Sequence, residues 1–511
     1  MTEDPRATDD QLGPGAPTAP IELAGGPASA AARLGLPFVE VDDAMLDRLR
    51  GVCASVTRDA AELAEASRDW WPLAMTWALD GQVASLAAAV ARPTTPAEVA
   101  EVVRVCDAAG VPVTAAAGRS GVCGGSIPLY GGVVLDLCGL SGIRDVDDAS
   151  LVVDVAPGTF GDHFEYELRS GHGLTVGHWP QSMALSTVGG WLACRSAGQL
   201  STRYGKIEDL VVGLDVVLAD GRTIHTGGHA RQASGPDLNQ LFVGSEGTLG
   251  IIVGVRLRAR PVPPHTRHAA FGFSSFEDGL DACRRILRRG ATPAVLRLYD
   301  PVEGERNFGT GELAPLLVYD EGDGQLVDPT LEIVEEECET ALALDAGLVD
   351  RWMAHRNDVS ALEALISRGY VVDTMEVTGP WAALPRIYRD TLAAIGSVEG
   401  TLVASAHQSH SYPDGACLYF TFAGKPEPGD KDRFYRAVWD AGTRAVLAAG
   451  GSLSHHHGVG VNRGRFMREA LGGGFDVLAA VKHALDPNGI LNPGKLGLPS
   501  PFGPDPLIGP N

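Results

Sequence analysis

The spacing of apolar positions predicts a β–α–β unit near the start of the globular part of the chain. Residues 84–92 form an apolar run with the length of a buried strand. Over residues 96–109 apolar positions recur at helical spacing, with Thr95 at the N-cap position and Gly110 after the last turn. A second apolar run at residues 111–118 completes the unit.

Strand-like runs continue to about residue 260, after which helical and strand-like segments alternate. The best boundary signal is the proline-rich stretch at residues 261–264. Helical patterns lie at residues 329–346, 380–398 and 429–449, and strand-like runs lie between them. The pattern therefore predicts an α+β fold with more than one part.

The two ends of the chain have a different composition. Residues 1–30 are rich in Ala, Pro, Gly and Asp and carry no periodicity, so we expect a mobile tail there. Helical spacing begins over residues 42–68. Residues 499–511 are rich in proline, and we interpret them as a second tail.

Charge and composition exclude several classes of protein. The 64 acidic and 41 basic side chains give a formal net charge of −23, whereas a nucleic-acid-binding protein needs a basic face. Neither a membrane span nor a signal peptide is expected, because no apolar run is long enough and the N-terminus is acidic. The eight cysteines are scattered without a CxxC pair, which favours reduced thiols and a cytosolic location. Glycine is frequent, at 64 residues, as expected where backbone closely approaches a large ligand.

The first candidate site is the glycine-rich loop GRSGVCGGS at residues 118–126. It joins two predicted strands, whereas a nicotinamide-type Rossmann domain or a P-loop binds phosphate where a strand leads into a helix. Successive backbone N–H groups with one guanidinium suit a pyrophosphate, and a plain hairpin turn is the alternative. The residues expected to make these contacts are Gly118, Arg119, Ser120, Gly121, Gly124 and Gly125.

Further motifs follow in a fixed order: SMALSTVGGWLACRSAGQLSTRYGKIEDLV at 182–211, GSEGTLGIIV at 244–253, and SHHHGVG with DPNGILNPGK at 454–460 and 486–495. Together with the first loop they resemble the FAD-binding oxidases and dehydrogenases of the vanillyl-alcohol-oxidase type. Within that group, STVGGW, YGKIEDLV and SHHHGVG are most similar to alkyldihydroxyacetonephosphate synthase and its bacterial relatives. The resemblance covers about residues 75–498.

The resemblance implies an α+β protein with a two-subdomain FAD-binding module of the PCMH type and an α+β cap domain. It implies FAD as the cofactor. We expect FAD to be non-covalent, because the first loop has no histidine to tether it and Cys123 is a poor substitute. The expected segments are a disordered tail at 1–30, an N-terminal helical segment at 31–74, the FAD-binding domain at 75–260, the cap or substrate domain at 261–454, a C-terminal return to the FAD-binding module at 455–498, and a tail at 499–511.

In the family, the second and third motifs hold the isoalloxazine, the pyrophosphate and the adenosine half of the cofactor. A helix start is the alternative interpretation around Glu246. Glu208 and Asp209 are interpreted as structural, in a cap or a turn. The expected cofactor contacts here are Ser186, Thr187, Gly189, Gly190, Glu246, Gly247, Ile251 and Asn492.

Two arginines are candidates for binding an anionic substrate group. Arg195 follows the apolar GGWLA and suits either such a group or a structural carboxylate. Arg356 lies where the family often has a substrate-binding arginine, and its fork of N–H donors suits a carboxylate or a phosphate. A surface salt bridge with Asp358 or Glu363 is the alternative for Arg356.

Four side chains are candidates for proton transfer. His455, His456 and His457 lie on a glycine-flanked loop. In the synthases this triplet faces the flavin and takes part in proton transfer and substrate binding, for which a pKa near neutrality is suited. Tyr419 matches the family's active-site tyrosine, with a core position as the alternative. A metal-binding tract or an exposed polar loop is the alternative for the triplet.

The first hypothesis is an enzyme similar to alkylglycerone-phosphate synthase, which serves ether-lipid synthesis. In that family acyl-dihydroxyacetone phosphate loses a proton, flavin N5 captures the carbon, and a fatty alcohol replaces the fatty acid without net redox. An apolar tunnel is then expected from Trp352, Trp381, Phe420 and Phe422, with core packing as the alternative. The expected partner is a small-molecule or lipid-like substrate. A homodimer and a peripheral membrane contact stay open.

The second hypothesis is an FAD-dependent oxidoreductase of a D-2-hydroxy acid, such as lactate, glycolate or 2-hydroxyglutarate, or of another alcohol. Several such relatives bind a divalent ion through histidines and a glutamate, but His456 stands at the glutamate position here. His407 and His410 are further candidate ligands, yet the missing carboxylate counts against a metal, and none is expected. A flavin-bound sensor or scaffold is the least favoured class.

Overall fold

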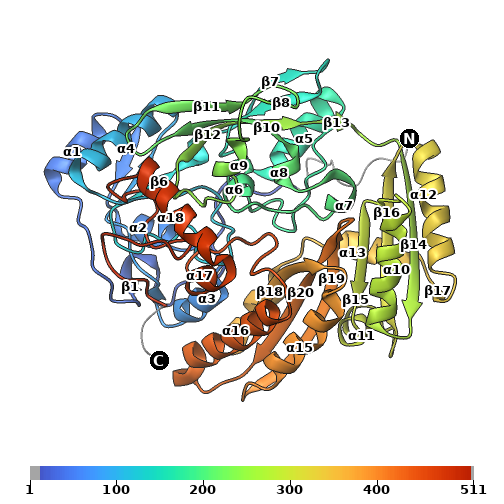
Figure 1. Cartoon of the computed structure of the whole chain (residues 1–511). Coiled ribbons are helices and arrows are strands. Elements are labelled where there is room, and N and C mark those ends of the chain that lie inside the picture. Colours follow the sequence, from blue (N-terminus) through green and yellow to red (C-terminus); the bar gives the residue numbers. More distant parts are fainter. Residues whose placement is uncertain (1–11, 508–511) are drawn as a thin grey trace.

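The computed structural model describes residues 12–507, which form two parts (Figure 1). The first part, blue to green in the figure, contains the N-terminal half of the chain. The C-terminal helices α17 (Met467–Leu471) and α18 (Gly473–Leu485), in red, lie against it. The second part, yellow-green to orange, is a cap built on one large sheet.

A four-stranded sheet begins the first part, in the strand order β2-β4-β6-β5. The central strand β6 runs parallel to both β4 and β5. Helix α4 (Pro96–Ala109) connects β4 to β5, begins at the Thr95 cap and ends at Gly110 with a φ of 64°, as the sequence predicts. The strands are β2 Ser55–Thr57, β4 Ala89–Arg92, β5 Val113–Ala116 and β6 Val133–Asp136.

A five-stranded antiparallel sheet follows, in the order β11-β10-β12-β8-β7. Its strands are β7 Ile143–Asp147, β8 Val152–Val155, β10 Val211–Val217, β11 Thr223–Gly227 and β12 Ile251–Arg258. The connections contain α5 Gly161–His172, β9 Leu174–Thr175, α6 Val188–Ala193, α7 Ser201–Tyr204, α8 Ile207–Leu210, α9 Asn239–Phe242 and β13 Arg260–Pro261. The second and third motifs therefore lie in loops and short helices around this sheet.

The cap is a seven-stranded sheet with the order β17-β14-β16-β15-β19-β20-β18. Its strands are β14 His265–Phe273, β15 Val295–Tyr299, β16 Ala314–Gly322, β17 Leu342–Leu344, β18 Val371–Pro380, β19 Thr401–Ser411 and β20 Gly415–Gly424. Its helices are α10 Phe276–Arg288, α11 Pro301–Phe308, α12 Gly324–Glu337, α13 Gly347–His355, α14 Ser360–Ser367, α15 Leu384–Gly396 and α16 Lys431–Ala448. Figure 1 shows α10, α15 and α16 along one side of this sheet.

After α16 the chain returns to the first part. The turn η5 (Gly464–Phe466) precedes α17, and after α18 Leu491 pairs in parallel with Val113 at the end of the first sheet. The backbone N–H of Asn492 donates to the Val113 carbonyl at 2.8 Å. The chain's C-terminal motif is thereby fixed beside the first glycine loop.

Aromatic side chains join the two parts. Trp77 lies on α3 (Pro72–Ala78), and Trp71 directly precedes this helix. The two rings pack edge to face with centroids 5.4 Å apart. The indole N–H of Trp71 donates to the Tyr435 hydroxyl of α16 at 3.0 Å. Both tryptophans belong to the same apolar core as Phe420 and Phe422 of the cap. This shared core fixes the position of the cap over the first part.

Both predicted tails are wrong where the structure describes them. Ile21 and Leu23 are buried, and the Thr18 carbonyl accepts the indole N–H of Trp70 at 3.1 Å. At the other end Leu507 is buried, and the Tyr130 hydroxyl donates to backbone carbonyls near it. Isolated apolar residues among prolines and glycines carry no period, so the sequence pattern does not reveal this packing. Residues 1–11 and 508–511 lie outside the described residues.

Three element boundaries also differ from the prediction. The helical spacing over residues 42–68 corresponds to two helices with β2 between them, and the run at 84–92 is a strand only over its last four residues. Helix α12 begins at Gly324, contains Pro329 and ends at Glu337, so the predicted helix at 329–346 begins too late and ends too late. The remaining elements are η2 Pro27–Ser29, β1 Ala31–Ala32, α1 Asp43–Arg50, α2 Ala60–Ala66, β3 Gln82–Val83, η3 Leu137–Gly139 and η4 Pro428–Asp430. Within residues 12–507 no helix is both long and apolar enough to cross a membrane.

Candidate active site

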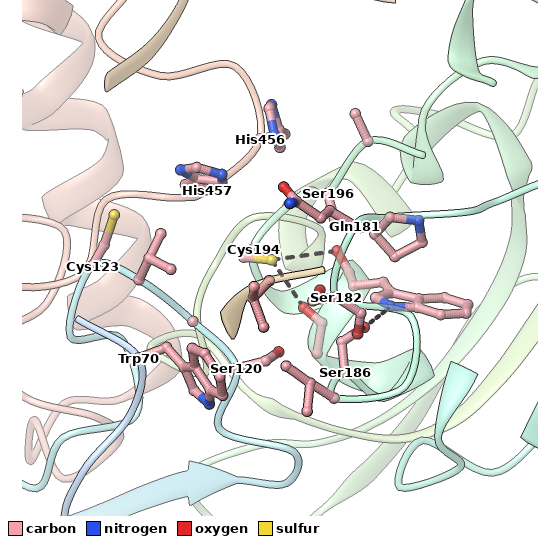
Figure 2. Close-up of a pocket in the computed structure, with 18 of the residues that line it drawn as sticks. Trp70, Ser120, Cys123, Gln181, Ser182, Ser186, Cys194, Ser196, His456 and His457 are labelled. Carbon is pink, nitrogen blue, oxygen red and sulfur yellow. Dashed lines mark hydrogen bonds between the residues drawn. The ribbon is translucent and has the colours of Figure 1, made fainter. Parts of the chain in front are cut away.

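A cavity of about 940 Å³ lies between the first part and the cap. Its walls come from the first glycine loop, the second and third motifs, β15, β19 and β20, and the C-terminal histidine loop (454–460). Figure 2 shows His456 and His457 across this pocket from Ser120 and Trp70, with Cys194 and Ser196 between them. Its volume is at the upper end of the range for small-molecule and cofactor sites.

The first glycine loop presents unpaired backbone donors to the cavity. Within the described chain, no backbone N–H of residues 118–125 donates a hydrogen bond to another residue. A Cβ on Gly118 would lie 2.3 Å from the Leu185 carbonyl oxygen, so the backbone passes there without room for a side chain. Arg119 Nη1 is buried, has no hydrogen-bond partner in the described residues and lies 3.5 Å from Asp136 Oδ2. Unpaired donors are costly, so the loop suits a ligand rich in acceptor oxygens.

Two side chains hold this loop against the later motifs. Asn492 Nδ2 donates to the carbonyl oxygens of Gly125 at 2.9 Å and Glu246 at 2.6 Å. The Glu246 carboxylate accepts the backbone N–H groups of Val459 at 2.5 Å and Gly460 at 2.8 Å. Asn492 Oδ1 is buried and has no hydrogen-bond partner among the described residues. The first loop, the third motif and the histidine loop therefore form one connected wall.

The structure brings most of the expected cofactor residues to the cavity. Gly124 does not line it, because its own Cβ direction faces Trp71 and Val461, and Asn492 lies behind the wall. Those that line the cavity are Gly118, Arg119, Ser120, Gly121, Gly125, Ser186, Thr187, Gly189, Gly190, Glu246, Gly247 and Ile251.

Two cysteines lie at the cavity, and burial keeps both thiols protonated. Burial raises the pKa of Cys194 to about 12 and that of Cys123 well above its ordinary value. A protonated thiol is a poor nucleophile, so neither is suited to attack a flavin ring. Non-covalent attachment of the cofactor remains our prediction.

Arg195 is not part of the cavity wall. Its Nε donates to Glu208 Oε1 at 3.2 Å, and its Nη2 donates to Gln240 Oε1 at 3.1 Å. Arg195 therefore contacts a structural carboxylate, Glu208, which was the alternative to substrate binding in the sequence analysis. Asp209 accepts the backbone N–H of Lys206 at 2.9 Å and caps α8, as interpreted from the sequence.

The histidine loop presents two of its three imidazoles to the cavity. His456 and His457 line it, whereas His455 lies behind them with its Nε2 3.0 Å from the Tyr412 hydroxyl. Burial lowers the pKa of all three, so the neutral imidazole is favoured near neutral pH. The triplet thus supplies neutral imidazoles, each with one ring nitrogen that can accept a hydrogen bond.

Tyr419 stands on β20 and faces the cavity. Its hydroxyl accepts the Thr374 hydroxyl proton at 3.0 Å and lies 3.5 Å from His457 Nε2. Its ring stacks on that of His407, with centroids 4.8 Å apart and planes at 17°. Burial raises the pKa of Tyr419 above its ordinary value, so the hydroxyl is protonated in the resting protein.

Two guanidinium groups flank the same indole ring at the cavity. The Cζ atoms of Arg297 and Arg356 lie 5.7 Å and 5.9 Å from the Trp352 ring centroid. Arg356 also donates to the Met353 carbonyl at 3.0 Å. Arg297 was missed in the sequence, although a single charged residue in the apolar strand VLRLY is a usable signal. Both arginines line the cavity.

His410 forms a cluster with two members of the triplet. Ring nitrogens of His410, His455 and His456 lie within 4.8 Å of one another, and this group contains no carboxylate. Both ring nitrogens of His407 are bonded elsewhere, so His407 is not a member. That the protein holds no metal stays a prediction.

The expected apolar tunnel is only partly present. Trp352 lines the cavity, but Phe420 and Phe422 are fully buried in the cap core. Side chains alternate along β20, so Tyr419 and Thr421 face the cavity while both phenylalanines face away. Trp381 lies outside the cavity, where its N–H donates to the Tyr412 carbonyl at 2.9 Å. Core packing was the correct alternative for the two phenylalanines.

Comparison with known proteins agrees with this architecture. Two family models match, the "FAD binding domain" over residues 87–227 and the "FAD linked oxidases, C-terminal domain" over residues 262–496. The "uncharacterized FAD-linked oxidoreductase YgcU" of Escherichia coli K12 is 31% identical over 411 residues, which cover 76% of this chain and 83% of that protein. The fold and the site therefore define a flavin-dependent enzyme. The chain belongs to the family of FAD-linked oxidoreductases, and FAD is its cofactor.

Other relatives have names with different activities. Alkyldihydroxyacetonephosphate synthase of Dictyostelium discoideum is 28% identical over 81% of this chain and 74% of its own length. Glycolate oxidase subunit GlcD of Bacillus subtilis is 28% identical over 81% of this chain and 90% of its own length. A solved alkyldihydroxyacetonephosphate synthase superposes with a TM-score of 0.75 at 22% identity, over 92% of this chain and 88% of that one. p-Cresol methylhydroxylase superposes with 0.69 at 17% identity, over 91% and 99%. These structures confirm the expected PCMH-type fold.

The residues present fit FAD. The unpaired amides of residues 118–125 and the Arg119 guanidinium suit its pyrophosphate, which needs local donors in a chain of net charge −23. Gly118 and Gly189 have no side chain, so neighbouring segments approach their backbone closely at the cavity wall. A Cβ on Gly189 would lie 2.6 Å from the Pro157 side chain.

Proposed function

We propose that this enzyme resembles alkylglycerone-phosphate synthase and exchanges the acyl group of acyl-dihydroxyacetone phosphate for a fatty alcohol. The observation that carries the proposal is the unpaired charge of Arg297. Among the described residues no carboxylate lies within 4.0 Å of its guanidinium, which lines the cavity and donates only to the neutral Tyr299 hydroxyl and the His407 ring. A cation in this position favours an anionic substrate group.

Each of the remaining residues has a role in the proposed reaction. Arg297 and Arg356, which both lie near the Trp352 ring, bind the phosphate. The Tyr419 hydroxyl takes the proton of the substrate carbon as it passes its own proton to His457. Bound FAD supplies the group that stores and returns an electron pair. The fatty acid then leaves, the alcohol takes its place, and no net redox occurs.

Part of the cavity lining suits an acyl chain. The apolar side chains there come from α14 and the residue before it, and from the start of β18. They are Val359, Ala361, Leu362 and Val372. A cavity with both an apolar lining and an anion-binding group matches a substrate with a polar head and a long chain.

A second candidate is FAD-dependent oxidation of a D-2-hydroxy acid. Its support is the 28% identity with a glycolate oxidase subunit and the fact that two arginines also suit a carboxylate. The two candidates differ in redox balance. A dehydrogenase leaves the flavin reduced until an acceptor re-oxidises it, whereas the synthase needs no acceptor.

The experiment is an anaerobic absorbance titration of the FAD-loaded enzyme. Acyl-dihydroxyacetone phosphate should bleach the flavin band, and a fatty alcohol should restore it without an acceptor. Bleaching by D-lactate, glycolate or D-2-hydroxyglutarate that persists until an acceptor is added supports the second candidate and contradicts the first. If none of the four compounds changes the spectrum, both candidates are wrong.

A further inference from the structure

At the cavity wall, the Arg297 guanidinium is in contact with a histidine and a glutamate that also line the cavity and are almost fully buried. Arg297 Nη2 lies 2.7 Å from His407 Nε2, and His407 Nδ1 lies 2.8 Å from Glu303 Oε2. His407 and Glu303 are 6% and 2% exposed. The three residues come from β15, β19 and α11, and they form one continuous chain along the cavity wall.

The chemistry of the three groups fixes the protons in this chain. A guanidinium only donates, so His407 Nε2 must accept from Arg297. The proton of the neutral ring is then on Nδ1, which donates it to the Glu303 carboxylate. A protonated His407 would direct an N–H group at the guanidinium. Burial, and next the Arg297 charge, lower the pKa of His407 to about 4, in agreement with a neutral ring.

Among the described residues, the ionised groups around this chain make their ion-pair contacts with one another and not with Arg297. Glu303 also pairs with Arg306, whose Nη2 lies 3.3 Å from Glu303 Oε1, and it accepts the Thr421 hydroxyl at 2.9 Å. Although burial opposes its ionisation, His407 and Arg306 lower the pKa of Glu303 to about 2. Asp300 is a second buried carboxylate beside Glu303 and Arg306, and burial raises its pKa to about 6. The nearest contacts of Arg297, the Tyr299 hydroxyl and the His407 ring, are neutral.

The same imidazole also contacts the group proposed for proton transfer. The His407 ring stacks on Tyr419, and the backbones of His407 and Tyr419 are paired across β19 and β20. The position of His407 thereby sets both the direction of the Arg297 guanidinium and the place of the Tyr419 ring.

We propose that His407, anchored by Glu303, is a positioning residue that holds Arg297 as the anion-binding group of the cavity at a fixed place relative to Tyr419. The proposal rests on the proposed function for the role of Arg297 in binding the substrate's anionic head. It adds that the affinity for this head depends on a neutral acceptor behind the guanidinium.

The test uses the FAD-loaded enzyme and sulfate, a dianion throughout the pH range used. Sulfate binding is followed by the change in the flavin absorption spectrum, with Arg297→Gln as the reference for loss of the site. His407→Phe keeps the stacked ring but removes both hydrogen bonds, and we expect it to weaken sulfate binding about tenfold. His407→Gln supplies an amide oxygen for Arg297 and an amide N–H for Glu303. It should therefore restore the Kd for sulfate to within about threefold of the wild-type Kd.

The matched control is His268→Phe, the same substitution at a partly exposed histidine of the same sheet, which should leave sulfate binding unchanged. If His407→Phe does not retain FAD, His407→Met replaces it, since it also lacks both hydrogen bonds. All affinities are compared at one pH, because Asp373 also lines the cavity and its pKa is raised to about 7, so its charge changes between pH 8 and pH 5.

Four results overturn the proposal: no sulfate binding to the wild type, binding that Arg297→Gln leaves intact, wild-type affinity in His407→Phe, or no rescue by His407→Gln in a protein that retains FAD. The readout is independent of the substrate. If sulfate gives the expected pattern but acyl-dihydroxyacetone phosphate leaves the flavin unchanged, the positioning role stands and the proposed substrate is wrong.

Discussion

Glu376 and Arg463 form a fully buried ion pair directly beneath the histidine loop. Arg463 Nη1 donates to Glu376 Oε1 at 3.0 Å, and the same oxygen accepts the backbone N–H groups of His455, His456 and His457 at 3.2, 3.0 and 2.7 Å. Three consecutive amides that converge on one carboxylate oxygen require a negative charge there. The Arg463 charge lowers the pKa of Glu376 below its ordinary value despite burial, so the carboxylate remains ionised.

Replacing this carboxylate should be severely destabilising. Glu376→Gln leaves the Arg463 guanidinium buried without a counter-charge, and breaking one partner of a buried pair costs about 3–5 kcal/mol. We expect the free energy of unfolding, measured with chemical denaturant, to fall by that amount.

The matched control is Glu277→Gln. Glu277 pairs with the exposed Arg389 at 3.1 Å, so its replacement should cost less than about 1 kcal/mol. Equal losses in the two variants would contradict a special role of the buried pair.

Loss of the Tyr419 hydroxyl should slow the reaction and leave cofactor binding intact. The hydroxyl lies between Thr374 and His457 at the cavity, and loss of a proton-transfer group typically lowers a rate about 100-fold or more. The measurement is the single-turnover rate of flavin bleaching by the substrate, together with the FAD content of Tyr419→Phe. Tyr388→Phe removes a hydroxyl outside the cavity and should not change the rate. A Tyr419→Phe enzyme at the wild-type rate would exclude a role in proton transfer.

A helix could be predicted where the hydrophobic periodicity and the capping residues at both ends agree. This is the case for α4, which Thr95 and Gly110 cap in the structure. The packed ends could not, because Ile21 and Leu507 are single apolar residues that are buried only by distant parts of the chain. The helix predicted over residues 329–346 starts at Pro329, which lies inside α12. The helix begins five residues earlier, at the Asp323 cap, and accommodates the proline in its first turns.

In the site, motif order predicted the cavity walls, since the two glycine segments and the histidine loop meet there. The role of Arg195 could not be read from its neighbours in sequence, because Gln240 is brought to it by the fold. Arg297 and Glu303 were missed for a related reason. Their importance arises from contacts with His407, which is more than 100 residues away in the chain.

Gly118 should not tolerate a side chain. A Cβ there would be 2.3 Å from the Leu185 carbonyl oxygen, and such overpacking typically costs about 1–3 kcal/mol. Gly121, in the same loop, has open space, since the nearest atom to a Cβ there would be Asp69 Oδ2 at 3.9 Å. We expect Gly118→Ala to lower the thermal unfolding temperature of the protein without FAD, and Gly121→Ala to leave it nearly unchanged. Equal unfolding temperatures for the two variants would contradict the close approach.

Asp373 should make the stability fall as the pH rises. It lines the cavity, accepts the Tyr435 hydroxyl at 2.6 Å and the Trp439 N–H at 3.0 Å, and burial raises its pKa to about 7 from an ordinary value of 3.8. Between about pH 4 and pH 7 the folded protein therefore binds a proton that the unfolded chain has lost. The stability from this group is complete below about pH 4 and decreases by up to about 1.4 kcal/mol per pH unit until about pH 7.

Asp373→Asn removes this ionisation, at the constant cost of the hydrogen bond that Asp373 Oδ1 accepts from the Thr374 backbone N–H. The difference in unfolding free energy between Asp373→Asn and the wild type should therefore move in favour of the variant as the pH rises from about 4 to 7, and it should be flat above that range. Denaturant titrations of both proteins at half-unit pH intervals measure it. A difference that stays constant from pH 4 to pH 7 would mean that Asp373 is ionised in the folded protein throughout this range.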